Sequence, residues 1–192
     1  LYYRTFFADF LSKVFPSANE ETLRGIMTKT GEVVQDYLVG LLVVMFVVAC
    51  ANSIGFWWIG VDYPIFFGIL TGLLLIIPYI GIWAGATLPI ILSLATLSPS
   101  HALAIVAWVA AVQFIEANFV TPLVIGSKVS INPMVAMLAL LGGELLWGIP
   151  GLILAIPFTA IIKVIFDHVP AMQPYGFLLG EAPKRPKGTK AP

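Results

Sequence analysis

Long apolar stretches, interrupted at only a few points, dominate the pattern of the chain. From Tyr63 to Ile115 there is no Asp, Glu, Lys or Arg. That is enough apolar sequence for more than two bilayer crossings, because a helix needs roughly 20 apolar residues to span about 30 Å. The pattern predicts an all-α, polytopic membrane helical bundle. Its expected parts are spans at about residues 37–60, 102–122 and 133–147, a last span that ends near residue 167, and a broken region at 63–97.

The first 36 residues have a different, amphipathic pattern. Apolar residues repeat at helical spacing in two segments separated by Pro16, with charged residues elsewhere on the helix circle. Ser17 and Glu20 have capping-box spacing at the start of the second segment. We expect helices that lie in the membrane interface or against the bundle, while a soluble partner-binding face would fit the same pattern. The chain thus divides into amphipathic interfacial helices at 1–36, a transmembrane transport bundle at 37–168 and a disordered, proline-rich basic tail at 169–192.

Pro78 breaks the apolar region between residues 63 and 97. Proline lacks the amide that would bond back one turn, and its ring clashes with a preceding carbonyl, so a helix must kink or stop there. The halves on either side would each be about 20–25 Å long, which is short of a comfortable crossing. Small residues four apart (Gly68 and Gly72, then Gly81 and Gly85) let helix backbones approach closely. We predict a tightly packed helical hairpin, either re-entrant or made of two short spans, with two ordinary spans and a proline loop as the alternative.

More glycines and prolines interrupt the second half of the bundle. Asn132 and Pro133 form a helix-start signal, with Asn as the cap and Pro at the first helical position. Lipid does not tolerate freed backbone groups unless protein or a water-filled cavity satisfies them. We therefore interpret the breaks as parts of a moving gate. The candidate gate residues are Pro78, Gly81, Pro122, Gly126, Asn132, Pro133, Gly143, Gly148 and Pro150.

Two carboxylates, Glu116 and Glu144, stand at predicted membrane depth, where an ionisable group is by default a functional hypothesis. On an ideal helix Gln113 lies about 60° from Glu116, whereas Asn118 points about 160° away. The three converge only if the helix unwinds before Pro122, which would resemble the midplane sites of secondary transporters. Alternatively, Glu116 and Asn118 cap free backbone groups of the broken region, and Glu144 lies at a hairpin tip near water. The candidate translocation residues are Gln113, Glu116, Asn118, Glu144 and Tyr79.

The composition is typical of a membrane protein and argues against several other classes of protein. The chain is 59% apolar and 10% charged, against roughly 45–50% and 25% for a soluble domain. Its net charge of zero gives no reason to expect a nucleic-acid partner. Cys50 stands alone, so there is no disulfide framework, and Asn52 is expected to hydrogen-bond a neighbouring helix. The sequence contains no His-Glu-x-x-His, Gly-x-Ser-x-Gly or Walker phosphate loop, so we expect no enzyme activity, no cofactor and no metal site.

Basic residues set the expected orientation. They cluster in the first 36 residues, at Lys128 and in the C-terminal tail. The positive-inside rule therefore puts these segments in the cytoplasm. Trp57, Trp58 and Trp147 then fall on the opposite face. Leu1 is not an initiator, and we expect the chain to be the C-terminal part of a longer protein.

Four motifs lie at and around the broken helices: Ile77-Pro78-Tyr79-Ile80-Gly81, Gln113-x-x-Glu116-x-Asn118-x-x-x-Pro122-x-x-x-Gly126, Asn132-Pro133 and Gly142-Gly143…Gly148…Gly151…Ala155-Ile-Pro157. With these motifs in this order, the sequence resembles the AI-2E family, the autoinducer-2 exporter family of bacterial transporters. The resemblance covers about residues 1–168 and departs at two positions, Leu123 and Asn132, where members often carry a basic residue and His. It implies a multi-pass, homo-oligomeric carrier of the bacterial inner membrane.

Two functions follow from the residues and the resemblance together. The leading expectation is a secondary transporter that exports a small polar solute, such as an autoinducer-2-like signal, through a site between broken helices. The alternative is a sodium or lithium/proton antiporter in which Glu116 or Glu144 alternates between proton and cation. The expected partners are accordingly a small-molecule solute or a monovalent cation, the lipid bilayer and further copies of the chain.

Overall fold

The computed structural model describes residues 10, 13, 20–125 and 131–180, and this part of the chain contains helices and no strand. It thereby confirms the all-helical prediction. Three helical stretches are long and apolar enough to cross a membrane: Glu20–Ile59, Pro99–Val124 and Ile149–His168. In chain order the elements are α2 (Glu20–Ile59), α3 (Pro64–Leu74), α4 (Gly81–Thr96), α5 (Pro99–Ile115), the π-helix η1 (Glu116–Val120), α6 (Thr121–Val124), α7 (Pro133–Trp147), α8 (Ile149–His168), the 3-10 helix η2 (Pro170–Met172) and α9 (Gln173–Leu179).

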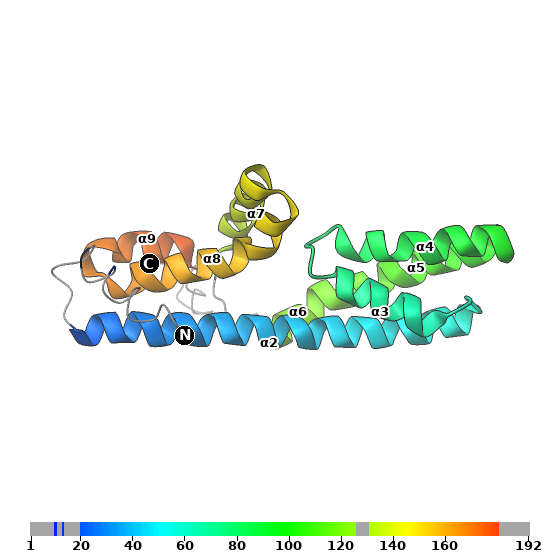
Figure 1. Ribbon diagram of the computed structural model, residues 1–192, viewed down its shortest axis with the longest axis horizontal. Coiled ribbons are helices and arrows are strands. Elements are labelled where there is room, and N and C mark those ends of the chain that lie inside the picture. Colours follow the sequence, from blue (N-terminus) through cyan, green and yellow to red (C-terminus); the bar gives the residue numbers. More distant parts are fainter. Residues whose placement is uncertain (1–9, 11–12, 14–19, 126–130, 181–192) are drawn as a thin grey trace, which may run out of the picture.

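The helix α2 runs the whole length of the molecule (Figure 1). Its 40 residues give about 60 Å at 1.5 Å per residue, roughly twice the hydrocarbon core of a bilayer. The predicted boundary at residue 36 is therefore absent, because the second amphipathic segment and the first span form one straight helix. Residues 20–36 continue along the axis of the span. Their buried residue Ile26 packs against Val169, beyond the end of α8. The first predicted amphipathic helix falls mostly outside the described residues.

The helices α3 and α4 form the predicted hairpin. The helix α3 runs back along α2, the chain turns at residues 75–80, and α4 returns to the end from which α3 came (Figure 1). The small residues allow this close packing: a Cβ at Gly68 would lie 2.1 Å from the Oγ of Ser53, and one at Gly85 would lie 2.6 Å from the Cα of Thr71. A re-entrant hairpin and a pair of short spans would both return the chain to the side from which it came. The observed arrangement therefore fits either form of the predicted hairpin.

The helix α5 and its continuation run antiparallel to α2 and close a four-helix core (Figure 1). Two glycines of α2 fix the register of this pair. Gly55 faces the Trp108 indole, where a Cβ would lie 2.0 Å from the ring, and Gly40 faces Ile125, where it would lie 2.9 Å from the side chain. The fully or nearly buried apolar residues of this core are Val44, Val48, Phe56, Val61, Phe67, Ile82, Ala86, Ile105, Val109 and Val112.

The helices α7 and α8 form a second hairpin, in which α8 lies along the N-terminal half of α2 and α7 projects away from it (Figure 1). Asn132 caps α7 as predicted, because its Oδ1 accepts a hydrogen bond of 2.9 Å from the Met134 amide. The turn is made by Gly148, whose φ of +63° favours glycine. The helices continue through Gly143 and through Pro157, so the predicted broken zone is confined to one turn.

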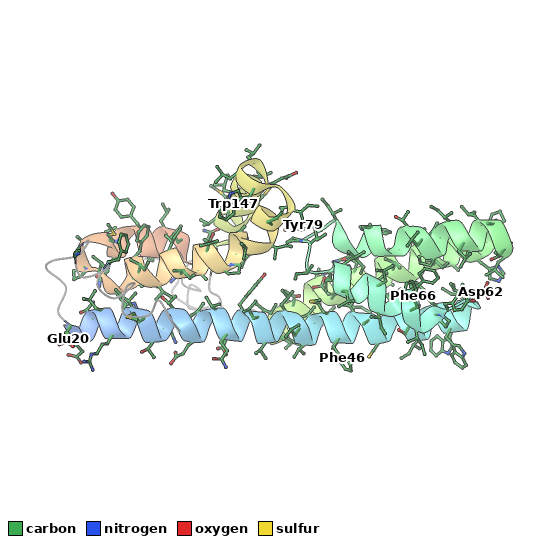
Figure 2. The ribbon with its side chains drawn as sticks, viewed as in Figure 1. Glu20, Phe46, Asp62, Phe66, Tyr79 and Trp147 are labelled. Carbon is green, nitrogen blue, oxygen red and sulfur yellow. The ribbon has the colours of Figure 1, made fainter. Side chains whose placement is uncertain are left out.

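The two tips of these hairpins point toward the middle of the molecule. Figure 2 shows Tyr79 and Trp147 nearer the middle of the long axis than either Glu20 or Asp62. Trp57 and Trp58 lie in the last turn of α2, beside Asp62. Trp147 therefore does not lie at the same end of the molecule as Trp57 and Trp58, although the predicted orientation put all three on one face.

Residues 170–179 are helical, although the sequence predicted a disordered tail from residue 169. The Tyr175 ring packs against Phe166 of α8 at a centroid distance of 6.0 Å. The backbone amide of Asn132 donates a hydrogen bond of 2.8 Å to the Leu179 carbonyl. Both contacts hold α9 against the second hairpin. Residues 181–192 lie outside the described part of the chain.

Candidate functional site

The helix that begins as α5 widens into a π-helix at Glu116–Val120 before it continues as α6. Its closing bond runs from the Thr121 amide to the Glu116 carbonyl, five residues back. Pro122, the next residue, has no amide to donate and its ring crowds the carbonyl one turn earlier. A wider turn accommodates the missing amide and the ring of Pro122 without ending the helix. Single π-turns of this kind occur frequently at functional sites.

Glu116 is the buried acidic side chain of this turn. It is 8% exposed, and both of its carboxylate oxygens accept hydrogen bonds. Gln113 Nε2 donates to Oε2 over 2.7 Å, and the Thr121 hydroxyl donates to Oε1. The carboxylate is thus held by two neutral side chains, and no described cation pairs with it. Thr121 was not among the candidate translocation residues predicted from the sequence, although its position next to Pro122 could have identified it.

Asn118 does not join this cluster. The predicted convergence with Gln113 and Glu116 required the helix to unwind, but the helix widens instead and leaves Asn118 exposed. Its Nδ2 donates a hydrogen bond of 2.8 Å to the Phe114 carbonyl of its own helix. The alternative prediction was that Asn118 caps backbone groups of the broken region between residues 63 and 97. This hydrogen bond does not do so. Asn118 instead bonds a backbone carbonyl of its own helix, one turn earlier.

Tyr79 and Pro78 lie at the tip of the α3–α4 hairpin. Tyr79 has a φ of +63°, which costs an L-residue with a side chain roughly 1–2 kcal/mol, and it is 79% exposed. Gly81 opens α4 so close to α3 that a Cβ there would lie 1.7 Å from the Leu74 carbonyl oxygen. The tip is therefore a narrow turn that presents one aromatic ring.

The remaining candidate residues lie in or near the second hairpin. Glu144 is exposed on α7, and it forms no hydrogen bond or ion pair through its side chain within the described ranges. A Cβ at Gly143 would lie 2.4 Å from the Gly151 carbonyl oxygen, so the two helices touch at this point. Pro133 and Pro150 occupy first-turn positions of α7 and α8. Gly126 lies outside the described residues. The structure thus brings Gln113 and Glu116 together and leaves Glu144 on another hairpin.

Several buried polar atoms have no hydrogen-bond partner within the described structure. Asn52 is 0% exposed, and both its Oδ1 and its Nδ2 are unpaired. The prediction that it bonds a neighbouring helix is therefore wrong. Ser93 Oγ, Trp108 Nε1 and Gln113 Oε1 are also buried and unpaired.

Two large pockets open on the outside of the hairpins, and both are apolar. One, of about 550 Å³, lies between α2 and α3 and includes Phe46, Cys50 and Ile69. The other, of about 590 Å³, lies between α7 and α8 and includes Trp147 and Phe158. Neither is lined by Glu116. Apolar grooves of this size suit lipid chains or other transmembrane helices better than a polar solute.

Comparisons with known proteins agree with the helical, membrane-type architecture. The sequence model described as "AI-2E family transporter" matches residues 1–171. "Putative transport protein YrrI" of Bacillus subtilis is 40% identical over 133 residues, which are 69% of this chain and 37% of that protein. "Putative transport protein YueF" of the same organism is 31% identical over 157 residues, 82% of this chain and 42% of that protein. The chain therefore spans less than half the length of these relatives.

Proposed function

This chain belongs to the AI-2E family of transporters, and we propose that it carries the translocation site of a secondary transporter that exports a small polar solute. The observation that supports this most is the buried Glu116 carboxylate, held by Gln113 and Thr121 at a π-turn inside an apolar helix. A charged group at membrane depth is costly and is retained mainly where it serves function.

The chemistry of the cluster supports a hydroxyl-rich solute such as an autoinducer-2-like signal. The Glu116 carboxylate accepts hydrogen bonds, and the Gln113 amide both donates and accepts them. Solute hydroxyls would replace Thr121 and Gln113 as the partners of Glu116 during transport. The exchange is nearly balanced, because one set of hydrogen bonds substitutes for another.

The gate in this proposal consists of the two hairpin tips. Tyr79 occupies one tip and Gly148 the other, and each tip joins two short or closely packed helices. Moving a hairpin tip would break fewer packing contacts than moving the long helix α2. The exposed Asn118, Pro122 and Glu144 side chains would then line the route only while the hairpins are displaced. Asn132 and Pro133 would fix the start of the second hairpin during this movement.

The orientation of the proposed carrier follows from its charges. Arg24 and Lys29 lie in the N-terminal half of α2, and Lys163 lies in the helix that packs against that half. Asp62 lies at the opposite end of the long axis (Figure 2). The positive-inside rule supports a cytoplasmic location for the first end, and with it for the C-terminal tail. The bacterial inner membrane and a homo-oligomer, with apolar grooves covered by lipid or by other copies, complete the proposal.

The second candidate is sodium or lithium/proton antiport. One observation favours it: Glu116 has only neutral partners, so a monovalent cation and a proton could occupy the same carboxylate in turn. Glu144 is a weaker candidate for this role because it is exposed and unpaired within the described ranges.

Flux measurements in proteoliposomes separate the two functions. Vesicles containing the purified protein are loaded with autoinducer-2, and its efflux is followed with and without a sodium gradient. Export predicts efflux that does not need sodium, together with no pH change driven by sodium alone. Antiport predicts a sodium-driven pH signal that Glu116→Gln abolishes. Vesicles that show neither signal, with protein that is demonstrably folded, would contradict both candidates.

A further inference from the structure

The core between α2, α3, α4 and α5 contains polar side chains that the fold itself does not satisfy. Asn52 of α2 has no solvent exposure, and neither its amide nor its carbonyl oxygen has a described partner. Ser93 of α4 is 1% exposed, and its hydroxyl is also unpaired. By contrast, Ser53, next to Asn52, donates a hydrogen bond of 2.8 Å to the Ala49 carbonyl.

Unpaired polar groups are unusual in such a place. Burying an amide without a hydrogen bond is unfavourable, and within a bilayer there is no surrounding water to supply one. A leucine at position 52 has the same number of side-chain heavy atoms and the same branching, and it would carry no such cost. Buried unsatisfied groups in native proteins therefore call for a specific explanation, such as a ligand or water that the fold accommodates. The described fold thus leaves both polar atoms of Asn52 available to a molecule that enters this core.

The register between α2 and α5 locates Asn52 relative to the Glu116 cluster. Gly55 faces Trp108, and Gly40 faces Val124 and Ile125, so the two antiparallel helices stay in step over this length. Asn52 precedes Gly55 by three residues, which puts it opposite about position 111, within one helical turn of Gln113.

Gln113 adds an unpaired atom of its own to this level of the core. It holds Glu116 through its Nε2 and leaves its buried Oε1 unpaired. Two helices thus present unpaired carboxamide atoms at one level of the core.

We infer that Asn52 is a specificity-determining contact of the transported solute, opposite Gln113 and Glu116 on the neighbouring helix. This inference rests on the proposed transport function and adds a solute-contact residue to it. The Asn52 amide offers two donor hydrogens and its carbonyl an acceptor, so it pairs fully with a solute that carries several hydroxyl groups. A bare sodium or lithium ion would satisfy the oxygen and leave both donors unpaired. The solute is accordingly an uncharged polyhydroxylated molecule.

The first test compares Asn52→Leu with wild type in autoinducer-2-loaded proteoliposomes, together with a thermal unfolding curve. Removal of two or three hydrogen bonds to the solute should lower the efflux rate at least about tenfold and raise KM. The unfolding temperature should stay unchanged or rise, because the substitution removes an unpaired group. Thr87→Val serves as the matched control, since the exposed Thr87 hydroxyl already bonds the Trp83 carbonyl. Wild-type efflux and KM in Asn52→Leu would overturn the inference, as would a lower unfolding temperature that accounts for the lost flux.

A second test does not depend on how Asn52→Leu folds. Cys50 lies on the outer face of α2 and lines the apolar groove against α3. A charged, membrane-impermeant thiosulfonate should therefore leave Cys50 unmodified in proteoliposomes. In a Cys50→Ala background, Asn52→Cys should react, and autoinducer-2 should slow the reaction. No reaction at position 52 would overturn the inference while leaving the transport function in place. Absence of any autoinducer-2 flux in wild type would overturn the transport function first.

Discussion

The Thr121 hydroxyl donates a hydrogen bond to the carboxylate of Glu116, five residues earlier in the same helix. In a regular α-helix two residues five apart point about 140° away from each other. The π-turn between them removes that divergence and brings both side chains to one side. The geometry of the candidate site therefore depends on an irregular turn, and changes to that turn should affect transport before they affect folding.

Replacement of Thr121 tests the hydrogen bond itself. Thr121→Val keeps the shape of the side chain but leaves one oxygen of the buried Glu116 carboxylate without its partner. We expect the free energy of unfolding to fall by roughly 1–3 kcal/mol, with a lower unfolding temperature and reduced efflux. Thr121→Ser, which restores the hydroxyl, should recover both. A valine variant with the stability and flux of wild type would show that the hydroxyl has no role.

Replacement of Pro122 tests the π-turn. Pro122→Ala returns a backbone amide and removes the ring, so the segment can close as a regular α-helix, which alanine favours over proline by up to ~3 kcal/mol. The regular helix would turn Thr121 away from Glu116. We expect an unchanged or higher unfolding temperature together with lower efflux in proteoliposomes. Unchanged efflux, or lost efflux explained entirely by unfolding, would argue against a functional π-turn.

The hydrophobic pattern was sufficient to predict the apolar helices and the hairpin break at Pro78. Long apolar runs, the missing amide of Pro78 and the cap formed by Asn132 are local signals, and each appears in the structure at the expected position. The small residues around Pro78 also predicted the close hairpin correctly. These features depend on residues that are neighbours in sequence.

Other features depend on contacts between distant segments or on a balance of small energies. The straight course of α2 past residue 36 depends on packing of Ile26 against Val169, which no local pattern reveals. The choice between an unwound turn and a π-turn before Pro122 decides whether Asn118 meets Glu116, and both choices relieve the same clash. The helix α9 forms where the basic, proline-rich composition predicted disorder, because Tyr175 packs on Phe166.

Contact between Gly143 and Gly151 gives a test of the second hairpin. A Cβ at Gly151 would lie 1.8 Å from the Gly143 carbonyl oxygen, so Gly151→Ala must push α7 and α8 apart at a cost of about 1–3 kcal/mol. We expect a lower unfolding temperature and a loss of flux. Gly142→Ala is the matched control, because nothing lies within 4 Å of a Cβ there, and alanine should be neutral or slightly stabilising. Equal behaviour of the two variants would contradict the close packing.

The backbone of Tyr79 offers a test of the first hairpin tip. Its φ of +63° is readily adopted by glycine. Tyr79→Gly should therefore raise the unfolding temperature, by an amount corresponding to about 1 kcal/mol. If the exposed ring contacts the solute at the gate, the same variant should transport more slowly despite its higher stability. A drop in unfolding temperature would show that the ring contributes packing that outweighs the strain.

The most direct test of the central claim compares the two carboxylates at predicted membrane depth in one flux assay. Glu116→Gln keeps the shape and much of the hydrogen bonding but removes the charge, while Glu144→Gln makes the same change on an exposed side chain of α7. Charged hydrogen bonds are worth about 1.5–3 kcal/mol, so Glu116→Gln should reduce the transport rate roughly tenfold to a hundredfold. Glu144→Gln should reduce the rate much less than Glu116→Gln, because Glu144 is exposed and lines the proposed route only while the hairpins are displaced. Full transport by Glu116→Gln, in protein with an unchanged unfolding temperature, would contradict the assignment of the site.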